Sequence, residues 1–134
     1  MTRFMKPVVS LVFAFSAGMK VLDFENTARY FQELTGHSFE TVGNILGVVI
    51  LVEFTLAWGL LLNRKDERLI LKFALAITSA FLLFSGSLAV AGATNCACFG
   101  TYIAFNPWLS FGKCLLLTIF LSRIYYESKN PKIV

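Results

Sequence analysis

The sequence predicts an all-α integral membrane protein: a four-helix bundle with both termini in the cytoplasm and a short amphipathic helix in its first outer loop. Hydrophobic residues make up 57% of its 134 positions and charged residues only 15%, whereas soluble domains average about 45–50% and 25%. A soluble domain of this length has too little interior to bury so much apolar surface. We therefore treat residues 1–134 as a single transmembrane domain.

Four apolar runs are each close to the length of a membrane-spanning helix, which needs about 20 mostly apolar residues. Inside lipid, each run must be helical because every backbone N–H and C=O has to be satisfied within the segment. The predicted spans cover about residues 7–22, 41–62, 69–93 and 108–126.

The first span is the shortest, and Pro7 is expected in its first turn, where proline is tolerated. A cleaved signal peptide is the alternative, because Arg3 and Lys6 precede an apolar core that ends in small residues. Lys20 and Asp23 follow that core at once, and removing the segment would leave an odd number of spans. These two points favour a retained membrane helix.

The orientation follows from the basic residues, since cytoplasmic loops are enriched in lysine and arginine. They gather before the first span, between the second and third, and after the fourth: Arg3, Lys6, Arg64, Lys65, Arg68, Lys72, Arg123, Lys129 and Lys132. The two opposite loops contain only Arg29. This predicts a multi-pass protein of the bacterial inner membrane with both termini cytoplasmic. The net charge of +4 then reflects topology, and no nucleic-acid partner is expected.

The first outer loop carries its own periodic pattern. Phe24, Ala28, Phe31 and Leu34 recur at helical spacing, and Gly36 follows as a stop signal. The pattern predicts a short amphipathic helix lying on the outer membrane face. A plain surface loop is the alternative.

The second outer loop contains Cys96-Ala97-Cys98, the sharpest motif in the chain. With the predicted orientation, both cysteines face a compartment where disulfides persist. A bridge between residues so close in sequence is strained and readily reduced, which suits exchange with a partner thiol. A structural bridge, two free thiols and metal binding stay open. Zinc would need about four ligands, and the only histidine, His37, lies in the other outer loop.

Four polar or reactive residues lie within the predicted spans or near their ends. Glu53 is near the middle of the second span, where a carboxylate is costly and therefore either paired or functional. Lys20 and Lys113 are candidate partners, although both are close enough to the outer surface to snorkel. Cys114, in the fourth span, could resolve a disulfide with the loop or be a small buried hydrophobe.

Several of these motifs resemble the MauE proteins of methylamine utilisation and the wider DoxX-like group of four-helix membrane proteins. The matching stretches are Phe15–Asp23, Glu53 followed by Trp58–Leu62, Cys96–Gly100, and Asn106-Pro107-Trp108. Two positions depart from the family pattern. Ala97 stands where glycine is commoner, and Gly112-Lys113 stands where the family usually has Arg-Asn or Arg-Asp.

The resemblance implies a membrane redox accessory protein. Cys96 and Cys98 would be its catalytic residues, exchanging disulfides with a thioredoxin-like periplasmic protein during maturation of a disulfide-rich dehydrogenase subunit. Quinone is the one cofactor that the resemblance leaves open. With no second cysteine pair, a complete relay from thiols to quinone within this chain would need Cys114. The sequence does not decide whether the protein is itself an enzyme.

Two other functions stay open. The chain could be a non-enzymatic subunit of a larger membrane complex, with the cysteines as a passive clip. It could also be a small carrier or channel that uses Glu53 for protons or ions.

Overall fold

The computed structural model describes residues 2–62, 66–96, 101 and 106–129. These residues form five helices: α1 (Thr2–Leu22), α2 (Phe24–Thr35), α3 (Phe39–Leu62), α4 (Glu67–Val90) and α5 (Pro107–Lys129). The predicted fold class is confirmed, because four of the helices are long and apolar enough to cross a membrane. Large apolar side chains project outward from all four, among them Leu11, Leu51, Leu83 and Leu116.

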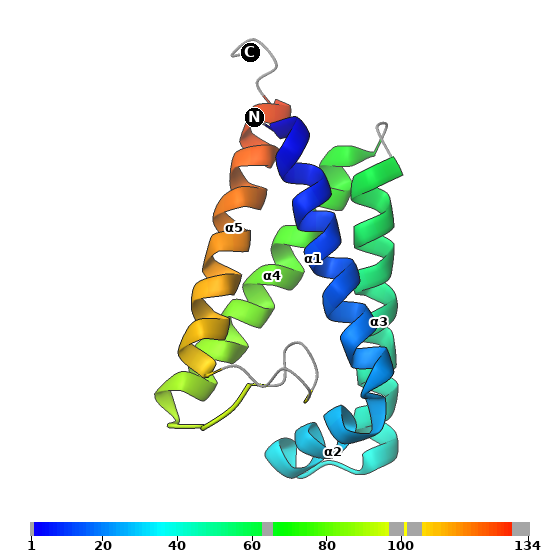
Figure 1. Cartoon of the computed structure of the whole chain (residues 1–134), viewed down its shortest axis with the longest axis vertical. Coiled ribbons are helices and arrows are strands. Elements are labelled where there is room, and N and C mark those ends of the chain that lie inside the picture. The colour runs from blue at the N-terminus through cyan, green and yellow to red at the C-terminus, as the bar shows by residue number, and fades with distance from the viewer. Residues whose placement is uncertain (1, 63–65, 97–100, 102–105, 130–134) are drawn as a thin grey trace.

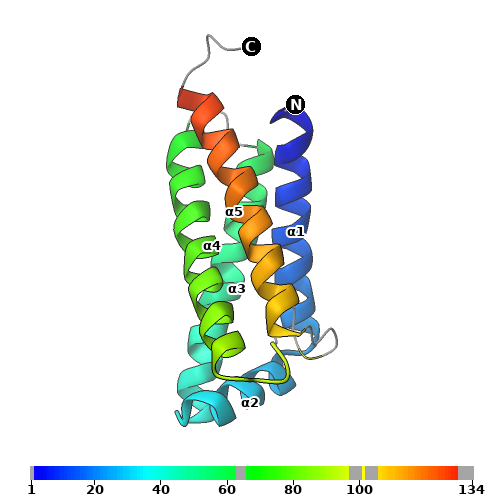
Figure 2. The ribbon, with the colours of Figure 1, turned by 90° about the vertical axis from the view of Figure 1, so that its left-hand side faces the viewer.

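The four long helices form an elongated bundle in which α1 packs mainly along α3 and α4 along α5 (Figure 1, Figure 2). The short helix α2 lies across one end of the bundle, against the ends of α1 and α3 (Figure 1). The first turn of α1 and the last turn of α5 lie at the opposite end (Figure 1). We call these the α2 end and the terminal end.

Helix α1 starts at Thr2, so the prediction that Pro7 lies in the first turn is wrong. Proline removes its own N–H and crowds the carbonyl four residues earlier, but the cost is limited to one turn. That turn is held by tertiary contacts: Met5 packs against the apolar core, and the Lys6 ammonium pairs with the Glu67 carboxylate at 2.5 Å.

The predicted amphipathic helix is confirmed as α2. It ends at Gly36, whose positive φ of 70° is a left-handed conformation that glycine adopts without strain. Only Asp23 separates α1 from α2, and its N–H continues the helical pattern by donating to the Met19 carbonyl at 3.1 Å.

Helix α4 ends at Val90, three residues before the predicted boundary, because the chain turns at Gly92 with a φ of +74°. The Gly92 N–H donates to the Ala89 carbonyl, and the Ala93 N–H donates to the Leu88 carbonyl. These two bonds form a Schellman motif. The turn folds Ala93 back onto Leu88 and leads the chain to Cys96. At the other end of the sequence, α5 continues to Lys129, beyond the predicted residue 126.

The terminal end holds the larger apolar core, in which α1, α3, α4 and α5 all take part. Its buried members are Val9, Phe13, Leu56, Ala57, Leu60, Leu71, Ala74, Leu121 and Ile124. A smaller apolar cluster lies at the α2 end and joins α1, α2 and α3. Its buried members are Ala17, Ala28, Val42, Leu46 and Ile50.

Candidate functional site

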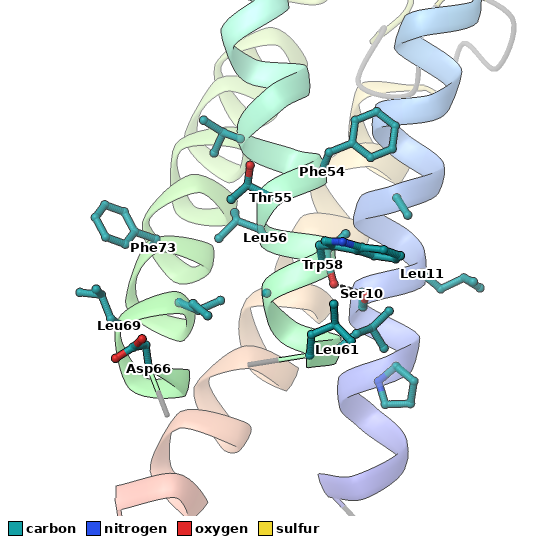
Figure 3. A pocket seen from close by; sticks show the side chains of 17 residues that line it. Ser10, Leu11, Phe54, Thr55, Leu56, Trp58, Leu61, Asp66, Leu69 and Phe73 are labelled. Atoms are coloured by element: carbon teal, nitrogen blue, oxygen red, sulfur yellow. Dashed lines mark hydrogen bonds between the residues drawn. The ribbon is translucent and has the colours of Figure 1, made fainter. Parts of the chain in front are cut away.

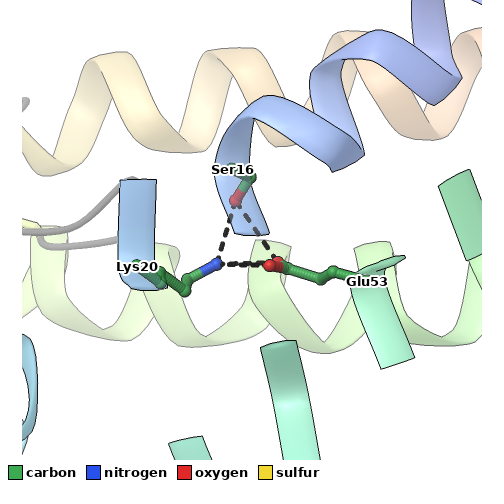
Figure 4. A network of polar contacts seen from close by, with 3 residues as sticks. All are labelled: Ser16, Lys20 and Glu53. Carbon is green, nitrogen blue, oxygen red and sulfur yellow. Dashed lines mark hydrogen bonds and ion pairs between the residues drawn. The ribbon is translucent and has the colours of Figure 1, made fainter. Parts of the chain in front are cut away.

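A buried ion pair joins α1 to α3 (Figure 4). The Lys20 ammonium donates to both carboxylate oxygens of Glu53, at 2.7 Å and 2.8 Å, and to the Ser16 hydroxyl at 2.9 Å. The Ser16 hydroxyl in turn donates to Glu53 Oε1 at 3.3 Å. All three donors of the ammonium are therefore used within this network.

The local sequence explains why these side chains meet. Ser16 and Lys20 are four residues apart and lie one above the other on the face of α1 that packs against α3. Lys20 is only 2% exposed and Glu53 only 1%, so the snorkelling interpretation of Lys20 is wrong. The ammonium also lies 5.2 Å from the centre of the Phe81 ring on α4, close enough for a cation–π contact.

Lys113 and Cys114 approach the same network from α5. Together with Ser16 and Glu53 they line a small internal cavity of about 30 Å³. Lys113 interacts electrostatically with Glu53. The structure therefore brings together Lys20, Glu53, Lys113 and Cys114, which the sequence singled out separately.

Cys96, the first cysteine of the Cys-x-Cys motif, follows the turn that ends α4. Cys96 is fully buried and packs with Leu88 near the end of α4. It lies near enough to Cys114 for the two sulfur groups to interact electrostatically. Cys98, the other predicted catalytic cysteine, lies outside the described residues.

Two tethers hold the loop on either side of the cysteines. The Tyr30 hydroxyl on α2 donates to the Asn95 carbonyl at 2.6 Å. Asp23 Oδ2 accepts hydrogen bonds from the Thr101 N–H, at 2.9 Å, and from the Thr101 hydroxyl. Asp23 is 4% exposed, and its other oxygen accepts from the Asn26 amide at 2.7 Å. The loop is thus fixed to the α1–α2 junction and to α2.

Sequence reasoning assigned no role to these tethers. Asp23 and Thr101 are 78 residues apart and no periodicity connects them. A signal was present in Asp23 itself, because a carboxylate between two apolar helices needs hydrogen-bond donors when it is buried. Ser16 gave a clearer signal, being one helical turn before Lys20.

Two apolar hollows are lined by side chains of α1, α3 and α4. The larger one, about 1200 Å³, lies towards the terminal end and is lined by side chains such as Leu11, Phe54, Trp58 and Phe73 (Figure 3). Ser10 borders it, but its hydroxyl is used by the Ala57 carbonyl at 2.6 Å (Figure 3). A smaller hollow of about 320 Å³ lies nearer α2, where His37 and Lys20 are among its lining residues.

A comparison with protein-family models matches residues 1–126 to the model described as methylamine utilisation protein MauE. Comparisons with curated proteins and with solved structures gave no match.

Proposed function

The chain belongs to the methylamine utilisation MauE family, as its motifs predicted, and we propose that it is a membrane redox accessory protein. In this proposal the loop around Cys96 and Cys98 exchanges disulfides with a thioredoxin-like periplasmic partner. The protein itself is a multi-pass membrane protein embedded in the lipid bilayer, as its family and its four candidate spans indicate.

The tethered loop is the observation that carries the proposal. A chain that needed only a hydrophobic bundle would gain little from fixing Asn95 and Thr101 on either side of two cysteines. Exchange between thiols needs the attacking and leaving sulfur atoms to be held in line. The contacts of Asn95 and Thr101 support that role, because these residues flank the two cysteines in the sequence.

The proposed reaction transfers two electrons and two protons. Cys96 and Cys98, as thiols, join in a disulfide while a disulfide of the partner becomes two thiols, or the reverse. Because Cys96 is fully buried, we assign it the inner position and Cys98 the exchange with the partner. A mixed disulfide between Cys98 and the partner is then the intermediate, and Cys96 resolves it.

The basic residues support a periplasmic position for this loop. Lys6, Arg68, Arg123 and Lys129 belong to the terminal end, whereas the α2 end has Arg29. By the positive-inside rule, this distribution supports our proposal that the terminal end lies in the bacterial cytoplasm and that the cysteines face the periplasmic side of the inner membrane.

Thiol trapping in intact cells tests the proposal. Cells are quenched with acid, and free thiols are alkylated with a maleimide reagent that adds mass. In Cys96→Ser we expect a mixed disulfide between Cys98 and a soluble partner, because the resolving sulfur is gone. In Cys98→Ser this adduct should be absent. A C96S/C98S variant carrying Val90→Cys, which places a thiol at an exposed site near the loop, controls for reagent access.

The proposal fails if Cys96 and Cys98 keep one redox state whatever partner or oxidant is supplied. The alternative, a structural subunit of a larger membrane complex, is favoured by the apolar hollow between α3 and α4, which a neighbouring helix could fill. A C96S/C98S variant that still supports the pathway and co-purifies with a complex in fixed proportion would favour that function.

A further inference from the structure

Cys114 has polar neighbours, which a cysteine that only fills space in an apolar core does not need. It is 3% exposed and lies on the face of α5 that meets α4. The Ser85 side chain on α4 lies beside its sulfur, and the Ser85 hydroxyl donates to the Leu82 carbonyl at 3.3 Å. Four residues earlier on the same face of α5, Ser110 is 1% exposed, and its hydroxyl has no hydrogen-bond partner among the described residues.

Cys96 and Cys114 lie against adjacent turns of α4. Cys96 packs with Leu88, and Cys114 contacts Ser85. Ser85 and Leu88 are both buried and three residues apart, so they are neighbours on one face of the helix, about 4.5 Å apart along its axis. The two cysteines therefore lie beside the same face of α4.

Cys114 also lines the small cavity that Lys113 and Glu53 share, and Glu53 is bound to Lys20. The sulfur therefore lies beside polar side chains in the interior of the bundle.

We propose that Cys114 is a third reacting thiol, which takes over the disulfide of the loop by bonding to Cys96. This inference rests on the proposed function and adds an inner step to it. The Cys114 thiolate attacks Cys96 Sγ of the Cys96–Cys98 disulfide, the old S–S bond breaks, and the new bond joins Cys96 to Cys114. Cys98 leaves as a thiolate and takes up the proton that Cys114 lost, so no external oxidant is consumed.

The chain offers a direct readout because trypsin cuts after Lys113, between the two cysteines. A Cys96–Cys98 disulfide stays within the peptide of residues 73–113. A Cys96–Cys114 disulfide joins that peptide to the peptide of residues 114–123. The full-length protein in lipid nanodiscs is treated with diamide, which takes two electrons and two protons from a thiol pair. It is then alkylated, digested without reductant and analysed by mass spectrometry.

We expect the joined peptide in Cys98→Ser, where Cys114 is the only remaining partner for Cys96, and a mixture of both forms in the unaltered chain. C98S/C114S should give none. The matched control is the triple variant C98S/C114S with Leu115→Cys, which moves the thiol by one residue to a position that is 42% exposed. It should give none either, since its sulfur points away from α4.

The inference is overturned if Cys98→Ser gives no joined peptide, or if the Leu115→Cys control gives as much of it. If Cys114→Ser leaves exchange between the loop and its partner unchanged, and Cys98→Ser gives no joined peptide, the proposed function stands and the inner step falls. If Cys96→Ser and Cys98→Ser leave the partner's redox state unchanged, the proposed function falls as well.

Discussion

The two ends of the bundle are held together in different ways. At the terminal end, nine buried residues from all four long helices form a continuous apolar core. Towards the α2 end, polar contacts link the elements: the buried Lys20–Glu53 pair, the partly buried Asp23–Thr101 contact and the exposed Tyr30–Asn95 hydrogen bond. Polar groups inside a membrane protein are costly and mark function more often than stability. The comparison suggests that one end supplies the framework and the other end the chemistry.

The largest expected effect comes from breaking the buried ion pair. Lys20→Met leaves the Glu53 carboxylate buried without its main partner, and removing one member of a buried pair costs about 3–5 kcal/mol. We expect the free energy of unfolding in detergent micelles, measured by denaturant titration, to fall by about this amount.

The double variant K20M/E53Q, measured in the same assay, tests whether Lys20→Met loses stability because a charge is left unpaired or because packing changes. It removes the stranded carboxylate, so a large part of the lost stability should return. If the double variant is as unstable as Lys20→Met alone, the loss is due to packing and the ion-pair explanation is wrong.

A slightly smaller effect is expected from the apolar core at the terminal end. Leu121 is fully buried, and Leu121→Ala should lower the free energy of unfolding by about 2–5 kcal/mol because it leaves a cavity. Alkylation of Cys96 in the folded protein should keep its rate, since the two regions are distinct. Leu116→Ala, at a lipid-facing position that is 56% exposed, is the matched control. A change in Cys96 reactivity in Leu121→Ala would mean that the two ends are coupled.

Breaking the contact between Asp23 and Thr101 is expected to have the smallest effect on the stability of the whole bundle. Its main effect should be on the exposure of Cys96. Asp23→Asn keeps the shape of the side chain but removes the charge that accepts from Thr101. Hydrogen bonds to charged groups contribute about 1.5–3 kcal/mol, so local opening of the loop should become at least about tenfold more frequent. The alkylation rate of Cys96 under native conditions measures this opening. Tyr30→Phe should act in the same direction but less, and unchanged rates in both variants would contradict the tether.

The sequence allowed the helices to be predicted because lipid leaves few choices for an apolar run of this length. Helix ends were less certain. Gly36 was recognised as the end of α2, but the same signal at Gly92 was overlooked and α4 was extended to residue 93. At Pro7 the local rule was outweighed by the contacts of Met5 and Lys6.

The candidate site was predictable to the extent that charges inside an apolar bundle are few. The sequence predicted Lys20 and Lys113 as candidate partners of Glu53, and the structure pairs it with Lys20. The approach of Cys96 to Cys114 depends on how the chain returns from the end of α4, and the Asp23–Thr101 contact depends on the packing of α2. Such contacts between distant segments leave no periodic trace in a single sequence.

The end of helix α1 sets the distance between the ion pair and the residue that anchors the loop. Lys20 and Asp23 are three residues apart, so the ammonium and the tethering carboxylate lie about one turn apart, and on nearly the same side of the helix. One residue inserted between them would rotate Asp23 by about 100° and carry the loop anchor away from Thr101. An insertion after Gly36 would leave both in place. Length changes are therefore tolerated beyond α2, while the spacing from Lys20 to Asp23 is fixed.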